Sequence, residues 1–254
     1  TIFPVYWMIK SSITVNSEMY VARPSLIAKH YTFENYVDLF TKTEFPRALL
    51  NSLMIAFLTT VCCLLISILG SYAMTRLKYP GRRFFKTSII FSYLIPTAVL
   101  FVPMYVFVSK LGFYDNKWAL LIIYPTTVVP YCCYMLMSYF KAIPYALEEA
   151  ALIDGCTRMK SLRYIITPIA LPGIAVVATF AFTMSWNEYL YAMIMTTSPA
   201  QQTAVVAISS FKYADSAIWG RIMAASVLTS LPVTIIYIVA QAQLISGKSD
   251  GSVK

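Results

Sequence analysis

The chain has 254 residues, of which 59% are hydrophobic and 12% are charged, and its formal net charge at pH 7 is +9. About a quarter of the residues of a soluble domain are charged, so the composition excludes a soluble protein with an ordinary polar surface. The charges are clustered, and they leave five uncharged windows, each longer than the roughly 20 residues with which a helix crosses a bilayer. These windows are residues 48–75, 87–109, 118–140, 164–187 and 222–247.

The first residues, 1–9, are apolar but too few to cross a bilayer, and we interpret them as the outer end of a first helix. They lack the basic leader and the small-residue cleavage site of a signal peptide. We therefore predict one all-α domain, residues 1–254, built as a polytopic membrane bundle of six transmembrane helices with an incomplete first one. The connection 10–47 is nearly balanced in charge, and the alternation of spans places it outside with short surface helices. The turn 111–116 and the segment 196–220, with its own surface helix, lie on the same side.

Basic side chains gather in the two remaining connections. They are Arg76, Lys78, Arg82, Arg83 and Lys86 after the second span, and Lys141, Arg158, Lys160 and Arg163 after the fourth. Under the positive-inside rule both connections are cytoplasmic. A charge arranged in this way indicates membrane orientation rather than a nucleic-acid partner.

Prolines occur in most of the predicted spans, at Pro96, Pro103, Pro125, Pro130, Pro168, Pro172 and Pro232. Each removes a backbone hydrogen bond and bends its helix, and in lipid the freed carbonyl needs another partner. Two interpretations stay open: kinks tolerated by a static bundle, or bent helices around a cavity that changes shape.

The outer part of the fifth span carries Trp186, Asn187 and Glu188. An ionisable residue within a span is costly and is a functional candidate by default, so Asn187 and Glu188 are candidates for a substrate path. The alternative places Glu188 near the outer headgroups in structural hydrogen bonds, with Trp186, Tyr189 and Tyr191 as an aromatic belt.

Other polar and reactive residues indicate packing rather than chemistry. Asn51 and Ser52 are expected to join helices, and the five cysteines to pack as small apolar residues. His30 has no ligand spacing around it, so no metal site is predicted, and neither a carboxylate pair nor a nucleophile–histidine set indicates a catalytic site.

The loop of about 141–165 contains the most informative segment, Glu-Ala-Ala-Leu-Ile-Asp-Gly at 149–155. Its residues predict a short helix with Pro144 at the first helical position and with Glu148 and Glu149 near the first turn, where carboxylates favour the positive end of the helix dipole. Gly155 can adopt the left-handed conformation that ends a helix.

A second protein is expected to dock on this helix, because its small side chains leave a low surface beside the carboxylates. The predicted docking residues are Glu149, Ala150, Ala151, Asp154 and Gly155.

The stretch 149–172 resembles the cytoplasmic signature loop of the inner-membrane permeases of binding-protein-dependent ABC importers. The matching positions are Glu149, Ala150, Ala151, Asp154, Gly155, Ile165, Pro168, Leu171 and Pro172. Cys156, Leu162 and Thr167 depart from the family pattern, which usually has Ala, an aromatic residue and Leu there.

Other segments resemble the maltose-type sugar permeases, and most closely the smaller permease of their pair. These are Asn35-Tyr36, the stretch 45–52 with Asn51-Ser52, the run Trp186-Asn187-Glu188-Tyr189, and the tail 247–254, where Ser252 replaces the usual Ala.

The resemblance implies a type I ABC-importer permease fold with a cytoplasmic coupling helix, in a multi-pass protein of the bacterial inner membrane. It implies four kinds of partner besides membrane lipid: a second permease, two ATP-binding cassette subunits and an extracytoplasmic solute-binding protein. The chain itself would need no cofactor and would not be an enzyme, since ATP and Mg²⁺ belong to the ATPase subunits. The cargo would be a sugar or oligosaccharide.

Two alternatives remain. The same machinery could carry another solute, such as a polyamine or a phosphonate. A channel or an intramembrane enzyme that needs no ATPase is disfavoured, because the sequence has no ring of charge and no catalytic set.

Overall fold

The computed structural model describes residues 2–21, 25–211 and 219–249, with side chains up to residue 241 in the last range. The tail residues 250–254 and part of the predicted outer segment 196–220 lie outside the described residues. Helices build the described part, which contains no sheet. Their bounds are α1 Phe3–Ser12, α2 Asn16–Met19, α3 Glu34–Thr41, α4 Phe45–Arg76, α5 Arg82–Leu94, α6 Thr97–Lys110, α7 Ala119–Ala142, α8 Tyr145–Ile153, α9 Arg158–Ser161, the π-helical turn η1 Leu162–Ile166, α10 Thr167–Ile169, α11 Leu171–Trp186, α12 Leu190–Met195, α13 Ala204–Ser210 and α14 Trp219–Ser249.

Three described helices are long and apolar enough to cross a membrane: α4, α7 and α14. Two bent pairs pass the same test as units, α5 with α6 and the α9–α10 segment with α11. Together they cover the five uncharged windows, so the all-helical membrane class is confirmed. The count of six spans stays a prediction, since α1 has only 10 residues.

The two bent pairs turn beside prolines, and their angles are larger than those of a kinked helix. One bend lies at Pro96 and the other lies between Pro168 and Pro172. The axes of α5 and α6 meet at 100° at Ile95 and Pro96, and those of the 158–169 segment and α11 meet at 82° near Ala170. A residue before proline is pushed towards extended backbone, and Ile95 has ψ 122°. The window 87–109 is therefore not one straight span. Pro103 lies inside α6 without interrupting it, as do the prolines within α7 and α14.

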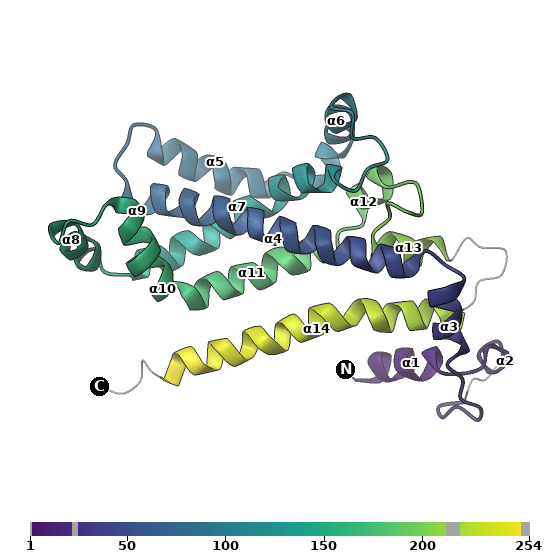
Figure 1. Cartoon of the computed structure of the whole chain (residues 1–254). Coiled ribbons are helices and arrows are strands. Elements are labelled where there is room, and N and C mark those ends of the chain that lie inside the picture. The colour runs from purple at the N-terminus through teal and green to yellow at the C-terminus, as the bar shows by residue number, and fades with distance from the viewer. Residues whose placement is uncertain (1, 22–24, 212–218, 250–254) are drawn as a thin grey trace.

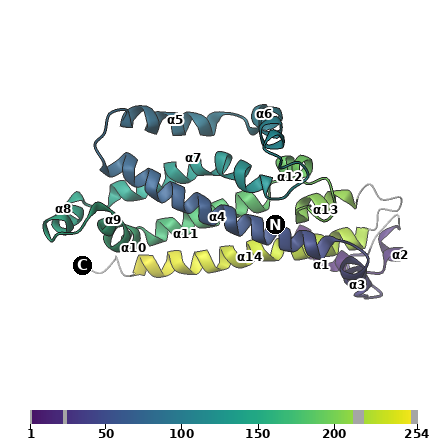
Figure 2. The ribbon, with the colours of Figure 1, turned by 45° about the horizontal axis from the view of Figure 1, so that its top comes forward.

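Helices α4, α7 and α11 pack against one another and form the centre of the bundle, with α5 along α7 (Figures 1 and 2). Their shared core includes Cys63, Cys132, Leu136, Phe140 and Val177. The buried cysteines are free thiols within this packing, as expected. Helix α14 packs on α1, α3 and α11.

Figure 1 shows α8 at one end of the bundle and α2, α3 and α13 at the opposite end. At that opposite end the amide of Asn51 donates to the carbonyls of Ala200 and Gln202, at 3.1 and 3.0 Å. The hydroxyl of Ser52 accepts from the backbone N–H of Ala204 at 2.8 Å. Both residues join segments of the bundle, as predicted, although Asn51 binds a loop rather than a helix.

Candidate functional site

Helix α8 begins one residue later than the sequence pattern predicts. Pro144 is its N-cap, with φ −57° and ψ 136°, and the first helical residue is Tyr145. The extended ψ of Pro144 turns the chain sharply out of α7, which ends at Ala142. Glu148 lies in the first turn, where its charge suits the positive end of the helix.

The C-terminal end of α8 has the predicted glycine stop. Gly155 adopts φ +82°, the left-handed region. The N–H of Cys156 donates to the carbonyl of Ala151 at 2.9 Å, and the N–H of Gly155 donates to that of Leu152 at 3.2 Å. This pair of bonds is a Schellman motif, which satisfies carbonyls at the helix end. The helix is therefore capped and short.

The predicted docking residues do not all face outward. Glu149, Ala150, Asp154 and Gly155 are exposed, whereas Ala151 is only 4% exposed. Ala151 lies three positions after the buried Glu148, so the helical period places both on the inner face of α8.

The outward face also carries an apolar side chain that sequence reasoning missed. Ile153 is 86% exposed, although an isoleucine is most often buried. The signal was present in the sequence, because Ile153 lies four residues after Glu149 and thus on the same face of a helix.

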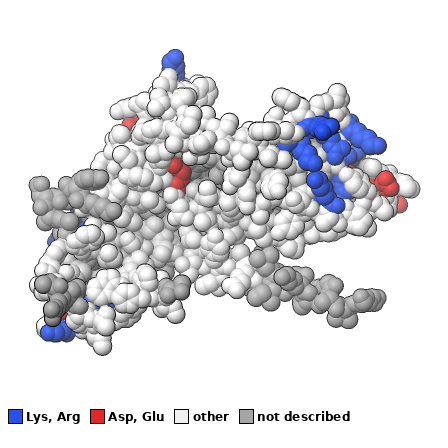
Figure 3. All heavy atoms as spheres, turned by 180° about the vertical axis from the view of Figure 1, so that it is seen from behind, with Lys and Arg blue, Asp and Glu red and all other residues white. Residues whose placement is uncertain are grey.

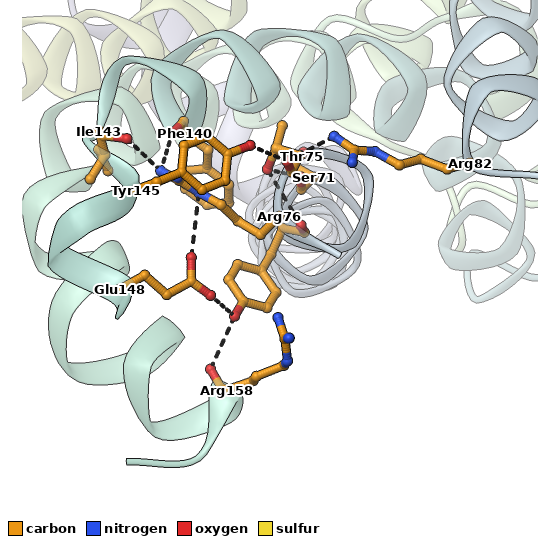
Figure 4. Close-up of polar contacts among 10 residues, drawn as sticks. Ser71, Thr75, Arg76, Arg82, Phe140, Ile143, Tyr145, Glu148 and Arg158 are labelled. Atoms are coloured by element: carbon orange, nitrogen blue, oxygen red, sulfur yellow. Dashed lines mark hydrogen bonds and ion pairs between the residues drawn. The ribbon is translucent and has the colours of Figure 1, made fainter. Parts of the chain in front are cut away.

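A buried ion pair joins α8 to the end of α4 (Figure 4). The phenol of Tyr72 donates to Oε1 of Glu148 at 2.5 Å. Nε of Arg76 lies 3.6 Å from Oε2 of the same carboxylate, and the side chains of Arg76 and Glu148 are 1% and 5% exposed. Tyr72 and Arg76 are one helical turn apart on α4, so a single face of that helix holds the α8 carboxylate.

The guanidinium of Arg76 is held by other groups as well. Its Nη2 donates to the carbonyls of Phe140 and Ile143, at 2.6 and 2.7 Å. The ring of Tyr145 lies 4.1 Å from its central carbon. Arg76 therefore connects the end of α4, the end of α7 and the start of α8.

Breaking such a pair by removing one partner is costly, typically about 3–5 kcal/mol, because a buried charge is left without compensation. The sequence pattern places Arg76 only in a basic loop and Glu148 only near the positive end of a helix dipole. A signal was available, namely an arginine and a tyrosine four residues apart at the end of a span. Its partner, however, lies 72 positions further along the chain.

The candidate path residues Asn187 and Glu188 line a cavity of about 430 Å³. Its wall also includes Tyr93, Tyr124, Thr126 and Thr127. The residues described along this wall include neither lysine nor arginine, and Glu188 is their one acidic member.

Glu188 has a structural role in addition to its place on the cavity. Its two carboxylate oxygens accept the backbone N–H groups of Tyr191 and Ala192, at 3.0 and 3.1 Å. It thereby caps the start of α12. Asn187 is exposed, and its side chain makes no hydrogen bond within the described ranges.

The alternative interpretation, an aromatic belt of Trp186, Tyr189 and Tyr191, is wrong for two of its three members. Trp186 is 2% exposed and donates its indole N–H to the carbonyl of Thr229 at 3.1 Å. Tyr191 is buried too, and its phenol donates to the carbonyl of Thr97 at 3.2 Å. Both rings pack inside the chain and cannot lie among headgroups.

Lysine and arginine side chains cluster over the end of the molecule that carries α8 (Figure 3). Their position agrees with the assignment of that end to the cytoplasm. Across the described ranges, no group of three or more His, Cys, Asp or Glu side chains could hold a metal ion.

Comparison with known proteins matches residues 66–248 to the family described as "Binding-protein-dependent transport system inner membrane component". The whole chain is 36% identical to the inner membrane ABC transporter permease protein YcjP of Escherichia coli, of which it covers 91%. It is 32% identical, over its full length and 89% of the relative, to the sulfoquinovosyl glycerol transport system permease protein SmoH of Agrobacterium fabrum. It is 33% identical, over its full length and 91% of the relative, to the trehalose/maltose transport system permease protein MalG of Thermococcus litoralis.

A solved structure with the same fold is a bacterial ABC transporter involved in the import of the acidic polysaccharide alginate. The TM-score is 0.84 at 22% identity, over 95% of this chain and 90% of that one.

Proposed function

Because this chain belongs to the family of inner-membrane components of binding-protein-dependent transport systems, we propose that it forms, with a second permease, the pathway of an ATP-driven sugar or oligosaccharide importer. Relatives that match its full length are named for a sulfoquinovosyl glycerol and for trehalose/maltose. The observation that carries the mechanical part of the proposal is the capped α8, held to α4 by the buried pair of Arg76 and Glu148.

The outer face of α8 is the docking surface for a cytoplasmic ATPase in this proposal. Glu149 would pair with a basic residue of that subunit, and Ala150 permits close approach. Asp154 and Gly155 lie at the exposed exit of the helix. Ala151 supports this surface from behind rather than forming part of it.

The buried pair of Arg76 and Glu148 anchors α8 to the end of α4. This anchor makes α8 a rigid lever. Driving a two-state gate nearly completely from one side to the other takes about 5.5 kcal/mol of differential coupling. A helix held by a buried pair, by a stacked arginine and by a Schellman cap can transmit such a load to α4. The ATP and Mg²⁺ are bound by two ATPase subunits, and this chain contributes motion rather than hydrolysis.

The cavity beside Asn187 and Glu188 is the proposed point of contact with the cargo. Phenol and hydroxyl groups from α5, α7 and the 187–191 segment line it, and such groups can pair with sugar hydroxyls. An extracytoplasmic binding protein would deliver the sugar to the opposite end from α8. A second solved alginate transporter of this fold, with a TM-score of 0.71, was in complex with a pentasaccharide-bound periplasmic protein.

Uptake by the purified assembly in proteoliposomes tests this function. We expect accumulation of a sugar that requires ATP on the α8 side and the binding protein on the other side. Accumulation of a polyamine or a phosphonate instead would refute the sugar assignment, and flux without ATP would indicate a channel.

Asn187→Ala tests the path separately, because this exposed side chain has no hydrogen bond to lose among the described residues. We expect slower uptake with unchanged ATPase assembly. Glu188→Gln is the less specific variant, since it also weakens the cap of α12. Normal uptake by the Asn187 variant would remove that residue from the path.

A further inference from the structure

A second and larger cavity, of about 890 Å³, opens beside α8 between the end of α4 and the start of α5. Four cationic side chains line it: Arg76, Lys78, Arg82 and Arg158. They come from α4, the connection 77–81, α5 and α9, so residues far apart in sequence converge on one space. The transport mechanism proposed above uses only the first of them.

Most of this positive charge has no negative partner. Arg76 faces Glu148, but its Nε and Nη1 are buried and make no hydrogen bond. Arg82 donates from Nε and Nη2 to the carbonyls of Met74 and Thr75, each at 2.8 Å. Carbonyl groups position this guanidinium without neutralising it.

Lys78 and Arg158 form no ion pair within the described ranges. Glu149 is the remaining acidic residue of the wall, and it is exposed and belongs to the proposed docking surface. The cavity therefore keeps an excess of positive charge.

The start of α5 adds to this field. Gly81 is its N-cap with φ +82°, and Arg82 and Arg83 follow, with no acidic residue in the first turn. Cations at the positive end of a helix dipole are unfavourable, whereas an anion placed there is stabilised. The 13-residue α5 thus begins with two charges that an anion in the cavity would compensate.

The surroundings identify the kind of anion. Helix α4 ends and α5 begins at this level, and both belong to candidate membrane spans. Phe84 and Phe85 on α5 are exposed directly beyond the two arginines, and Phe91 is exposed further along the same helix. A basic cluster followed by exposed apolar surface fits a headgroup with acyl chains better than it fits a soluble ion or an acidic peptide.

We propose that this cavity binds the phosphate of an anionic phospholipid of the cytoplasmic leaflet, with Lys78, Arg82 and Arg158 around it and the acyl chains along α5. Lys78 and Arg82 come from the α4–α5 side, and Arg158 comes from the α8–α9 side. A phosphate between them ties the two sides together, so the lipid supports the same connection as the buried pair of Arg76 and Glu148.

Native mass spectrometry of the purified assembly tests the site, with phosphatidylglycerol as the probe and phosphatidylcholine for comparison. The variant is Lys78→Gln with Arg158→Gln, which leaves the backbone contacts of Arg82 intact. The matched control is Lys29→Gln with Lys110→Gln, two exposed lysines elsewhere on the chain. Each basic side chain near an anionic surface contributes about fivefold in affinity. We therefore expect the variant to bind one fewer phosphatidylglycerol tightly and to lose about 25-fold in affinity at that site, while the control and phosphatidylcholine binding are unchanged.

Two results would overturn the proposal. The first is equal phosphatidylglycerol binding by the variant and the wild type; if the variant also loses the ATPase subunits, the cavity belongs to an acidic segment of the ATPase. The second is release of the bound lipid by millimolar inorganic phosphate, which would assign the cavity to a soluble anion.

Discussion

Replacing Glu148 by Gln removes one charge from the buried pair between α8 and α4 and changes the side-chain volume little. The wild-type carboxylate lies 3.6 Å from Nε of Arg76 and accepts the Tyr72 phenol at 2.5 Å. At 3.6 Å and an effective dielectric constant of about 20, two unit charges attract by about 5 kcal/mol. Loss of one partner of a buried pair costs about 3–5 kcal/mol. Arg76 keeps its two carbonyl acceptors and the ring of Tyr145 in the variant. We therefore expect a cost at the lower end of this range, about 3 kcal/mol.

Hydrogen–deuterium exchange of the α8 amides in the purified assembly measures this loss. A change of about 3 kcal/mol in the free energy of local opening corresponds to roughly a hundredfold faster exchange. Glu34→Gln is the matched control, because this carboxylate on α3 is exposed, lies at the opposite end from α8 and makes no ion pair in the described part of the chain. Adding Arg76→Met to the Glu148 variant should cost less than the sum of the two single changes, since the two residues interact directly. Unchanged α8 exchange in the Glu148 variant would refute the anchor.

Three further predictions concern backbone conformation, packing and pH. Gly155→Asn should preserve uptake, because asparagine tolerates the left-handed region that Gly155 adopts at φ +82°. Gly155→Val should reduce uptake and loosen the cap by about 1–2 kcal/mol, because a β-branched side chain is strained there; equal uptake by both would contradict this. Gly173→Ala should lower the Tm of the assembly, with a cost of about 1–3 kcal/mol, because the added Cβ would lie 2.4 Å from a tyrosine ring of α7. Gly70→Ala, whose Cβ would lie 3.5 Å from its nearest neighbour, should leave the Tm unchanged or raise it. Hydrogen bonds to its carboxylate lower the pKa of Glu18 below the ordinary value of 4.5. The largest effect comes from the backbone N–H of Lys29 and the next from the imidazole of His30. The ionised Glu18 carboxylate therefore stabilises the fold fully above pH 4.5, and this stabilisation is lost as the pH falls through the lowered pKa of the folded state. Proteolysis near Lys29 should rise in that acid range, and Glu18→Gln should remove the pH dependence.

The membrane class could be predicted from the sequence because it depends on a strong one-dimensional signal. A long run without charge has few alternatives to a membrane helix, and the five windows became three helices and two bent pairs. The glycine stop of α8 was equally local, since Gly155 needs only its own φ. The angle at Pro96 was not predictable, because a proline indicates that a helix ends or bends without specifying the direction of the next one.

The anchor of α8 depends on contacts between distant segments, and the sequence contains many equivalent candidates. Arg76 is one of several basic residues in its loop, and Glu148 adjoins a second glutamate. Which glutamate turns inward depends on how α8 packs against the end of α4, and Ala151 is buried with Glu148 because the two residues share one face of α8. The burial of Trp186 depends on another contact of this kind, since its indole N–H binds the carbonyl of Thr229 on α14, which lies 43 positions further along the chain.

The central claim is that α8 transmits the motion of an ATPase to the membrane bundle. A photoreactive amino acid at Ile153, whose side chain on α8 is 86% exposed, tests it in the assembled transporter, with the same probe at the outer-turn residue Leu111 as the control. We expect a covalent adduct with an ATPase subunit from position 153 and none from position 111. ATP-driven uptake by an assembly in which position 153 never labels the ATPase would contradict it.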